Sequence, residues 1–96
     1  MKSQVFRKTE KILYIYPDII EHENEFLNTI DDALRKLSEV DEIIIQRKYF
    51  DKKTHEEIAE ELDVDPRTVT RKKNRIIKRL SFILFPDEAI EELKNE

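Results

Sequence analysis

The sequence contains no glycine, and this absence restricts the fold more than any other feature. Tight β-hairpin turns depend on residues with positive φ, which glycine adopts most readily. Three prolines, Pro17, Pro66 and Pro86, interrupt a chain whose apolar residues otherwise recur with the 3.6-residue period of a helix. The sequence therefore predicts an all-α protein with one small domain, because 96 residues can enclose only one modest core.

The first part of the chain carries two apolar stripes. The step from Tyr16 to Pro17 should end the first helix, because a residue before proline disfavours helical geometry. The second stripe begins at Asp18 and continues to Leu37, which predicts the longest helix of the chain. The first stripe comprises Val5, Phe6, Ile12, Leu13 and Tyr16. The second comprises Ile19, Ile20, Phe26, Leu27, Ile30, Ala33, Leu34 and Leu37.

Capping residues predict where the next two helices begin. Ser38 is followed three residues later by Asp41, and Thr54 by Glu57, which is the spacing of a capping box. Helices are therefore expected to start after Ser38 and after Thr54. Their apolar sides are formed by Val40, Ile43, Ile44 and Phe50, and by Ile58, Ala59 and Leu62.

A helix-turn-helix pattern follows from these signals. Only residues 63–65 separate the helix that starts after Thr54 from another helix, in which Asp65 is the expected N-cap and Pro66 the first residue. Val64 is expected to be the buried apolar residue of the turn. Two capped helices joined so closely are typical of a helix-turn-helix unit.

The second helix of this pattern, which should end near Phe82, holds much of the positive charge. Residues 65–80 contain seven Lys or Arg and one acid, in a chain of formal net charge −4. At 100° per residue, one side of this helix is apolar and the opposite side is basic. The apolar side comprises Val69, Ile76, Ile77 and Leu80, and the basic side comprises Arg67, Arg71, Asn74, Arg75 and Lys78.

Double-stranded DNA is the partner that such a helix fits. Arg and Asn near the N-terminus of a helix in the major groove reach base edges, whereas cations and hydroxyls also bind phosphates. The residues expected to read bases are Arg67, Thr70, Arg71 and Asn74. The residues expected to contact phosphates are Thr54, Thr68, Lys72, Arg75, Lys78 and Arg79. The alternative explanation of the basic run is a solvated helix face without a partner.

Composition argues against other functions. Without cysteine, the chain has no disulfides and no thiolate chemistry. The segment His55-Glu-Glu-Ile-Ala lacks the second His of a zinc-protease motif, and no Gly-rich loop could hold a nucleotide phosphate. We therefore expect no enzyme, no metal and no cofactor, with His22 and His55 exposed and uninvolved. Because no apolar run of about 18 residues occurs, we expect a soluble cytoplasmic protein without membrane contact.

Residues 37–80 resemble region 4 of the sigma-70 family. A Leu-x-Glu opening leads through "KYF" to "EEIAEEL", a short turn, a Thr-Val pair and a basic helix that ends in Leu. With "EKILYIYPDII" before and "LSFILFPDEAIEEL" after this segment, the whole length is similar to the ArpU-like and RinA-like regulators of Firmicute prophages. The resemblance implies a helix-turn-helix activator of late phage genes that acts with RNA polymerase. The lack of sigma region 2 implies that the chain alone does not melt a promoter.

Three residues depart from the sigma pattern. Asp63 stands where glycine is usual, so it must take a left-handed conformation. Lys73 and Arg47 occupy positions that are normally apolar, and we expect their stems to pack while their charged heads reach solvent or an acid. The acidic run in residues 56–65 must in part point away from DNA or pair with the basic helix.

Three segments are expected: an N-terminal helical extension (1–36), the helix-turn-helix domain (37–85) and a short acidic helix (86–96). Residues 82–85 either seal the core or form an interface with a second copy or with polymerase. The stripe of the extension offers more apolar surface than the domain needs, which predicts a homodimer held by residues 5–34. The alternatives are a monomeric, sigma-like adaptor whose main partner is RNA polymerase, and a small-terminase-like DNA recognition protein.

Overall fold

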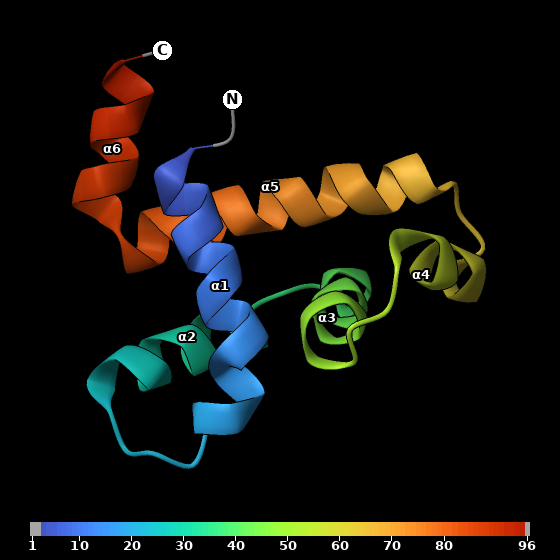
Figure 1. Ribbon diagram of the computed structural model, residues 1–96, viewed down its shortest axis with the longest axis horizontal. Helices are drawn as coiled ribbons and strands as arrows, with labels where there is room; N and C mark the ends of the chain where they lie inside the picture. The colour runs from blue at the N-terminus through green and yellow to red at the C-terminus, as the bar shows by residue number, and fades with distance from the viewer. Residues whose placement is uncertain (1–2, 96) are drawn as a thin grey trace.

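The structure, a computed structural model, describes residues 3–95, and its regular elements are all helical. The all-α prediction is confirmed, since residues 3–95 contain no β-strand. The element η1 is a π-helical turn that continues α3 directly. In chain order the elements are α1 (Gln4–Ile19), α2 (Glu25–Arg35), α3 (Glu39–Ile45), η1 (Gln46–Phe50), α4 (His55–Leu62), α5 (Pro66–Leu84) and α6 (Pro86–Lys94) (Figure 1).

The capping residues of α3 and α4 are those that the sequence predicts. The Ser38 side chain accepts a hydrogen bond of 3.2 Å from the Asp41 N–H. The Thr54 hydroxyl accepts from the Glu57 N–H at 3.1 Å, and the Glu57 carboxylate accepts from the Thr54 N–H at 3.0 Å. Each bond satisfies a backbone donor that has no partner inside its helix. Both predicted helix starts are confirmed.

The starts of α5 and α6 are confirmed as well. The Asp65 carboxylate accepts from the Arg67 N–H at 2.7 Å, and Pro66 is the first residue of α5. Proline is tolerated there because the N–H that it lacks would have no helical partner. The helix ends at Leu84, slightly beyond the predicted end, and α6 begins at Pro86.

The N-terminal helices differ from the prediction. Helix α1 continues through Pro17 to Ile19. Proline is tolerated there because it lies in the last turn, where the N–H that it lacks removes only one helical hydrogen bond near the helix end. A linker then leads to Asn24, which caps α2 by accepting from the Phe26 N–H at 2.8 Å. The prediction of one helix over residues 18–37 is therefore wrong, and the 19-residue α5 is the longest described helix.

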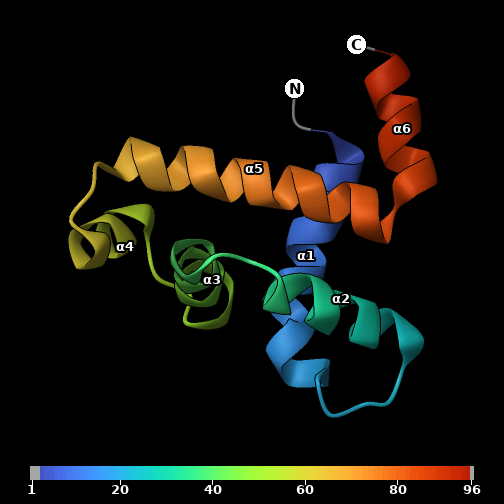
Figure 2. The same cartoon turned by 180° about the vertical axis from the view of Figure 1, so that it is seen from behind.

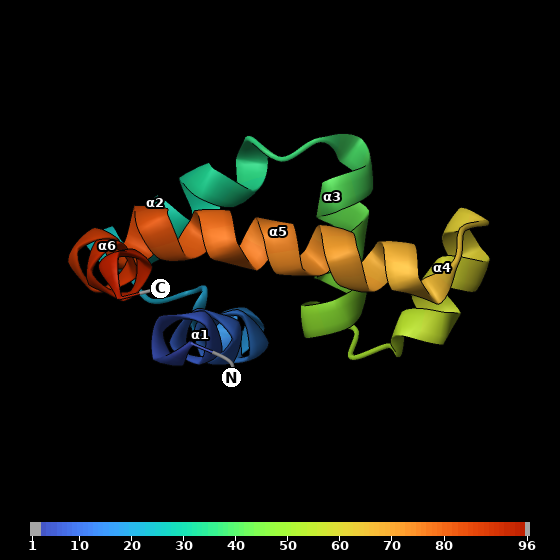
Figure 3. The same ribbon diagram turned by 90° about the horizontal axis from the view of Figure 1, so that it is seen from above.

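Helix α5 is the central element of the molecule, and the other helices pack along it (Figures 1 and 2). Helices α3 and α4 lie under its N-terminal half, whereas α1 crosses its C-terminal half and α6 turns away from its end. Seen from above, α1 lies on one side of α5 and α2 on the other (Figure 3). The molecule measures 37 × 37 × 20 Å along its principal axes, so it is a flat body with α5 running across it.

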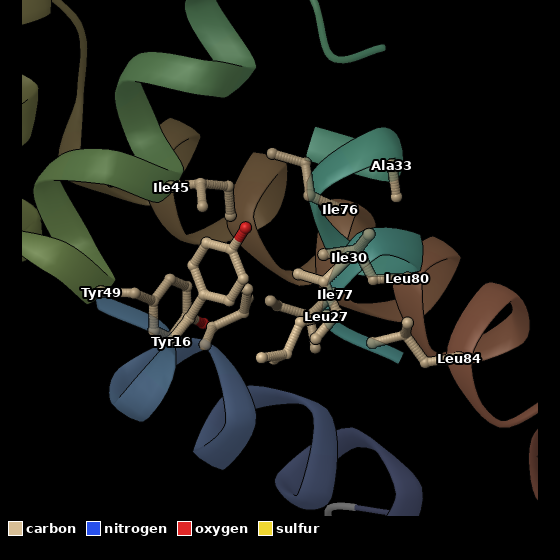
Figure 4. Close-up of a cluster of buried hydrophobic side chains, with 11 residues drawn as sticks. Tyr16, Leu27, Ile30, Ala33, Ile45, Tyr49, Ile76, Ile77, Leu80 and Leu84 are labelled. Atoms are coloured by element: carbon tan, nitrogen blue, oxygen red, sulfur yellow. The ribbon is translucent and has the colours of Figure 1, made fainter. Parts of the chain in front are cut away.

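Two clusters of buried apolar residues hold these helices together. The larger cluster joins α1, α2, α3, η1 and α5, and thus extends across the predicted boundary at residue 37 (Figure 4). The smaller cluster joins α3, α4 and α5. The larger cluster contains Leu13, Tyr16, Leu27, Ile30, Ala33, Ile45, Tyr49, Ile76, Ile77, Leu80 and Leu84. The smaller contains Ile44, Ile58, Ala59 and Val69.

The apolar stripe that predicted a dimer is mostly covered by the chain itself. Ile30 is completely buried and Leu27 is 9% exposed, because both lie in the larger cluster. Ile20 and Phe26 are exposed, at 52% and 37%, and Ile19 and Leu34 are half-buried. The expectation that this stripe exceeds what its own domain can cover is therefore wrong for its central residues.

Residues 82–85 serve partly as core. Leu84 is buried in the larger cluster, and Phe82 and Phe85 are half-buried. The Phe85 ring lies 5.8 Å from the Phe26 ring, between centroids, so it packs α5 against α2. Ile83 is half exposed. The interpretation as core residues thus holds for Leu84 and in part for the two phenylalanines, but not for Ile83.

Candidate nucleic-acid interface

The turn between α4 and α5 has the geometry that a helix-turn-helix unit requires. Asp63 adopts φ 57° and ψ 49°, the left-handed conformation expected from its position. The Val64 N–H then donates to the Ala59 carbonyl at 3.0 Å, which satisfies one of the last carbonyls of α4. Val64 itself is 40% exposed, so the prediction that it is buried in the turn is wrong.

Helix α5 buries its apolar side and exposes its basic side, as the sequence predicts. Val69, Ile76, Ile77 and Leu80 are each at most 2% exposed. The opposite side carries six exposed polar residues, which we call the basic face of α5: Arg67, Arg71, Asn74, Arg75, Lys78 and Arg79. Five of these six side chains are cationic, so the face suits a polyanion such as a phosphate backbone.

The other four predicted contact residues lie outside the basic face of α5. Thr54 is exposed at the N-cap of α4. Thr68 and Lys72 are half-buried and line a small cavity beside Val64. The Thr70 hydroxyl is turned toward α4 and the preceding turn of its own helix. It lies 2.8 Å from His55 Nδ1 and 3.2 Å from the Pro66 carbonyl oxygen.

His55 is not the exposed bystander that the sequence suggested. It is half-buried at the start of α4, and its Nδ1 bonds to Thr70 of α5. Its Nε2 is buried and has no hydrogen-bond partner among the described residues. Burial, with help from the positive charges of Lys48 and Lys73, lowers the pKa of His55. A His at the first position of a capped helix facing a basic helix was the only sequence signal for this contact.

Part of the acidic run is neutralised by nearby cations. The Asp65 carboxylate lies 3.1 Å from the Arg67 guanidinium, whose side chain is 92% exposed. Hydrogen bonding from Arg67 lowers the pKa of Asp65. In the same way the Arg47 guanidinium, 3.0 Å from Glu61, lowers the pKa of that carboxyl. An exposed pair contributes little to stability, so Arg67 can exchange Asp65 for a nucleic-acid ligand at small cost.

A buried polar network fixes the position of α5 relative to α1. The Lys73 side chain is 6% exposed and its Nζ lies 3.2 Å from a carboxylate oxygen of Glu10, as expected for a lysine that reaches an acid. The Tyr49 hydroxyl donates to the same Glu10 oxygen. Burial and this bond to Glu10 raise the pKa of Tyr49 far above its ordinary value, so the phenol stays protonated. The network connects α1, η1 and α5 through one carboxylate.

No group of three or more His, Asp or Glu among the described residues is placed to hold a metal ion. None of the described helices is both long and apolar enough to cross a lipid bilayer.

These features define a helix-turn-helix protein with a basic second helix. The family model described as sigma-70, region 4 matches residues 27–80, which is more than half of the chain. The chain therefore belongs to the sigma-70 region 4 family, and the match begins within α2, upstream of the resembling segment found in the sequence. Neither curated proteins nor solved structures gave a significant match. Membership of this family, whose domain binds DNA and is not enzymatic, indicates a DNA-binding regulator associated with RNA polymerase.

Proposed function

We propose that this protein is a sequence-specific regulator of transcription that inserts the N-terminal half of α5 into the major groove of DNA. The observation that carries the proposal is the basic face of α5, which lies opposite a fully buried side on the second helix of a capped helix-turn-helix unit. A major groove about 12 Å wide admits one helix of this kind. The simpler alternative, a solvated helix face, does not account for the family match.

The proposed contacts divide into two groups. Arg67, Arg71 and Asn74 read base edges, because they are exposed on the N-terminal half of α5. Thr70 contributes its methyl group, since its hydroxyl is already bonded within the protein. Phosphates are bound by Thr54, Thr68, Lys72, Arg75, Lys78 and Arg79.

We further propose that the protein activates late genes of a phage or prophage together with RNA polymerase. This proposal rests on the resemblance of the whole chain to ArpU-like and RinA-like regulators. A regulator of this kind acts in the cytoplasm, which is the location that we propose. The sigma-like adaptor and the small-terminase-like recogniser remain the alternatives. Specific duplex binding without polymerase would count against the adaptor, and a ring-sized oligomer would favour the terminase-like protein.

A homodimer remains a proposal, and its surface is now smaller than the sequence suggested. Ile20 and Phe26 are the most exposed members of the stripe, and Ile20 is the more exposed of the two, so Ile20→Asp is the appropriate test. Leu27→Asp is unsuitable because Leu27 is buried and the change would damage the core. Sedimentation at micromolar concentration should show a dimer that Ile20→Asp dissociates. A single monomeric species in the unaltered protein would exclude the dimer.

Selection of binding sites from random duplexes tests the main proposal, followed by two substitutions on the selected site. Arg71→Ala should cost about 1–3 kcal/mol of binding free energy on that site and relax preference at one base position. Lys78→Ala should weaken binding to all duplexes and lower the salt slope by about one unit. Lys94→Ala, which removes an exposed cation from α6, is the charge control. Equal losses on selected and random duplexes for Arg71 and Lys78 would exclude the base-reading role.

A further inference from the structure

Positive charge outside α5 is concentrated on two other segments. Residues 3–17 contain three Lys or Arg and one acid, and residues 46–55 contain four Lys or Arg and one acid. By contrast, residues 18–45 contain nine acids and only two Lys or Arg. The two basic segments form most of α1 and the stretch from η1 to the start of α4. A protein with net negative charge thus carries clusters of cations on elements other than α5.

The fold brings these two segments together on one side of α5. The rings of Tyr14 in α1 and Tyr49 in η1 are 4.8 Å apart, between centroids. The ammonium of Lys48 lies 5.9 Å from the centre of the Tyr14 ring. Figure 3 shows α1 and the chain from η1 to α4 on the same side of α5, with α2 on the other. Arg7, seven residues before Tyr14, falls on the same stripe of α1.

The cations on this side of α1 are available for a ligand. Arg7 and Lys11 are exposed, and neither forms an ion pair with another described residue. Glu10, the acid between them, is held by Lys73 and Tyr49. The neighbouring Lys8 is different, because its Nζ lies 2.8 Å from a Glu88 oxygen.

The side of α1 that carries Arg7 and Lys11 adjoins the basic face of α5. Phe6 of α1 lines the same cleft as Asn74 and Lys78 of α5, and the Lys73 ammonium lies 5.4 Å from the centre of the Phe6 ring. Lys78, a proposed phosphate contact, thus lies beside α1. A phosphate strand that Lys78 binds would therefore pass near α1.

We propose that Arg7, Lys11 and Lys48, which we call the α1 basic surface, bind the phosphate backbone beside the groove that α5 occupies. This inference rests on the proposed function. The α1 basic surface contacts no base edge and adds affinity for any sequence. It extends the contacted stretch of DNA on the side where α1 crosses α5.

The test compares two double variants that remove the same charge from the full chain. Arg7→Ala/Lys11→Ala should lower the slope of log affinity against log salt by about two units on a long duplex that carries the selected site. Lys8→Ala/Lys94→Ala should change the slope much less, because Lys8 is occupied by Glu88. The charge-preserving variant Arg7→Lys/Lys11→Arg should bind like the unaltered protein. Equal slopes for the two alanine variants would overturn the inference.

Two further measurements separate this inference from the proposed function. The duplex can be shortened stepwise from each end. The loss of salt slope caused by Arg7→Ala/Lys11→Ala should disappear when one end of the duplex is shortened, but not when the other end is. If the effect persists on the shortest duplex that still binds, the α1 basic surface does not contact flanking phosphates.

The second measurement compares two variants on the selected site. If Arg71→Ala weakens binding and Arg7→Ala/Lys11→Ala does not, only the role of the α1 basic surface is excluded. If neither variant weakens binding, the proposed function fails. Thermal unfolding of Arg71→Ala and of Arg7→Ala/Lys11→Ala should match that of the unaltered protein, because the replaced side chains are exposed.

Discussion

The two halves of α5 are held in different ways. The C-terminal half contributes Ile76, Ile77, Leu80 and Leu84 to the larger cluster, which is shared with α1, α2, α3 and η1. The N-terminal half contributes only Val69 to the smaller cluster of four buried residues. The half that presents the proposed base-reading side chains is thus the half with less apolar support. Stability is not uniform across a structure, and binding elements often belong to its less stable part.

Lys73 lies where these two halves meet, and its pair with Glu10 gives the largest expected effect. Glu10→Ala removes the carboxylate that a nearly buried ammonium contacts, which should lower the free energy of unfolding by about 3–5 kcal/mol. Glu88→Ala is the matched control, because its partner Lys8 is about half exposed and the loss should be at most about 1 kcal/mol. Urea unfolding of both variants measures the difference. Similar losses would show that the polar network does not hold α5 in place.

Truncation of one buried isoleucine in each cluster compares the two halves directly. Ile77→Ala in the larger cluster should cost about 2–5 kcal/mol of global stability, because it leaves a cavity among five elements. Ile58→Ala in the smaller cluster should mainly increase local opening of α4 and the start of α5. Native-state hydrogen exchange resolves the two outcomes. If Ile58→Ala accelerates exchange equally throughout the larger cluster, the two halves do not differ in stability.

The cap of α4 should have a smaller effect. Thr54→Ala removes the hydroxyl of a complete capping box and should lower the free energy of unfolding by about 1 kcal/mol in the absence of DNA. Ser38→Ala at the start of α3 provides a comparison cap of the same chemistry. Exchange of the α4 amides should rise in the Thr54 variant and stay unchanged in the Ser38 variant. Unchanged α4 amides in the Thr54 variant would mean that the cap does not limit local opening.

Titration of His55 should have the smallest effect. Burial lowers the pKa of His55 below its ordinary value of 6.5, so the folded state binds fewer protons than the unfolded state. The free energy of unfolding should therefore fall as the pH drops below about 6.5, until the folded pKa is passed. Urea midpoints between pH 5 and 8 should show this decrease in the unaltered protein and a flatter profile in His55→Gln. Identical profiles would exclude a contribution from His55.

Local signals were sufficient to predict the helix-turn-helix unit. The starts of α3, α4 and α5 are determined by residues at the helix ends themselves. The N-caps Ser38, Thr54 and Asp65 each accept a hydrogen bond from a backbone N–H two or three residues later, and Pro66 lacks an N–H that would have no helical partner. The buried and exposed sides of α5 follow from the helical period alone. The positive φ of Asp63 was predicted from the resemblance to the sigma pattern, in which glycine usually stands at this position of the turn.

Features that depend on distant partners could not be predicted. Glu10 and Lys73 are 63 residues apart, and no sequence pattern indicates that their side chains meet. The same holds for the burial of α2, which depends on where α5 passes.

The interruption of the helix between α1 and α2 could have been predicted from the sequence. Asn24 is a regular N-cap that a search for capping residues could have found, but the apolar stripe across it suggested one continuous helix.

Chemical-shift mapping tests most directly whether the basic face of α5 is the DNA-binding surface. Backbone amide shifts of the isotope-labelled protein are followed as a duplex carrying the selected site is added at moderate salt. We expect the largest changes in the N-terminal half of α5, residues 63–65 and the first turn of α4, with smaller changes near Arg7 and none on the outer side of α2. Changes centred on α2 or α6, with α5 unaffected, would exclude the basic face of α5 as the DNA-binding surface.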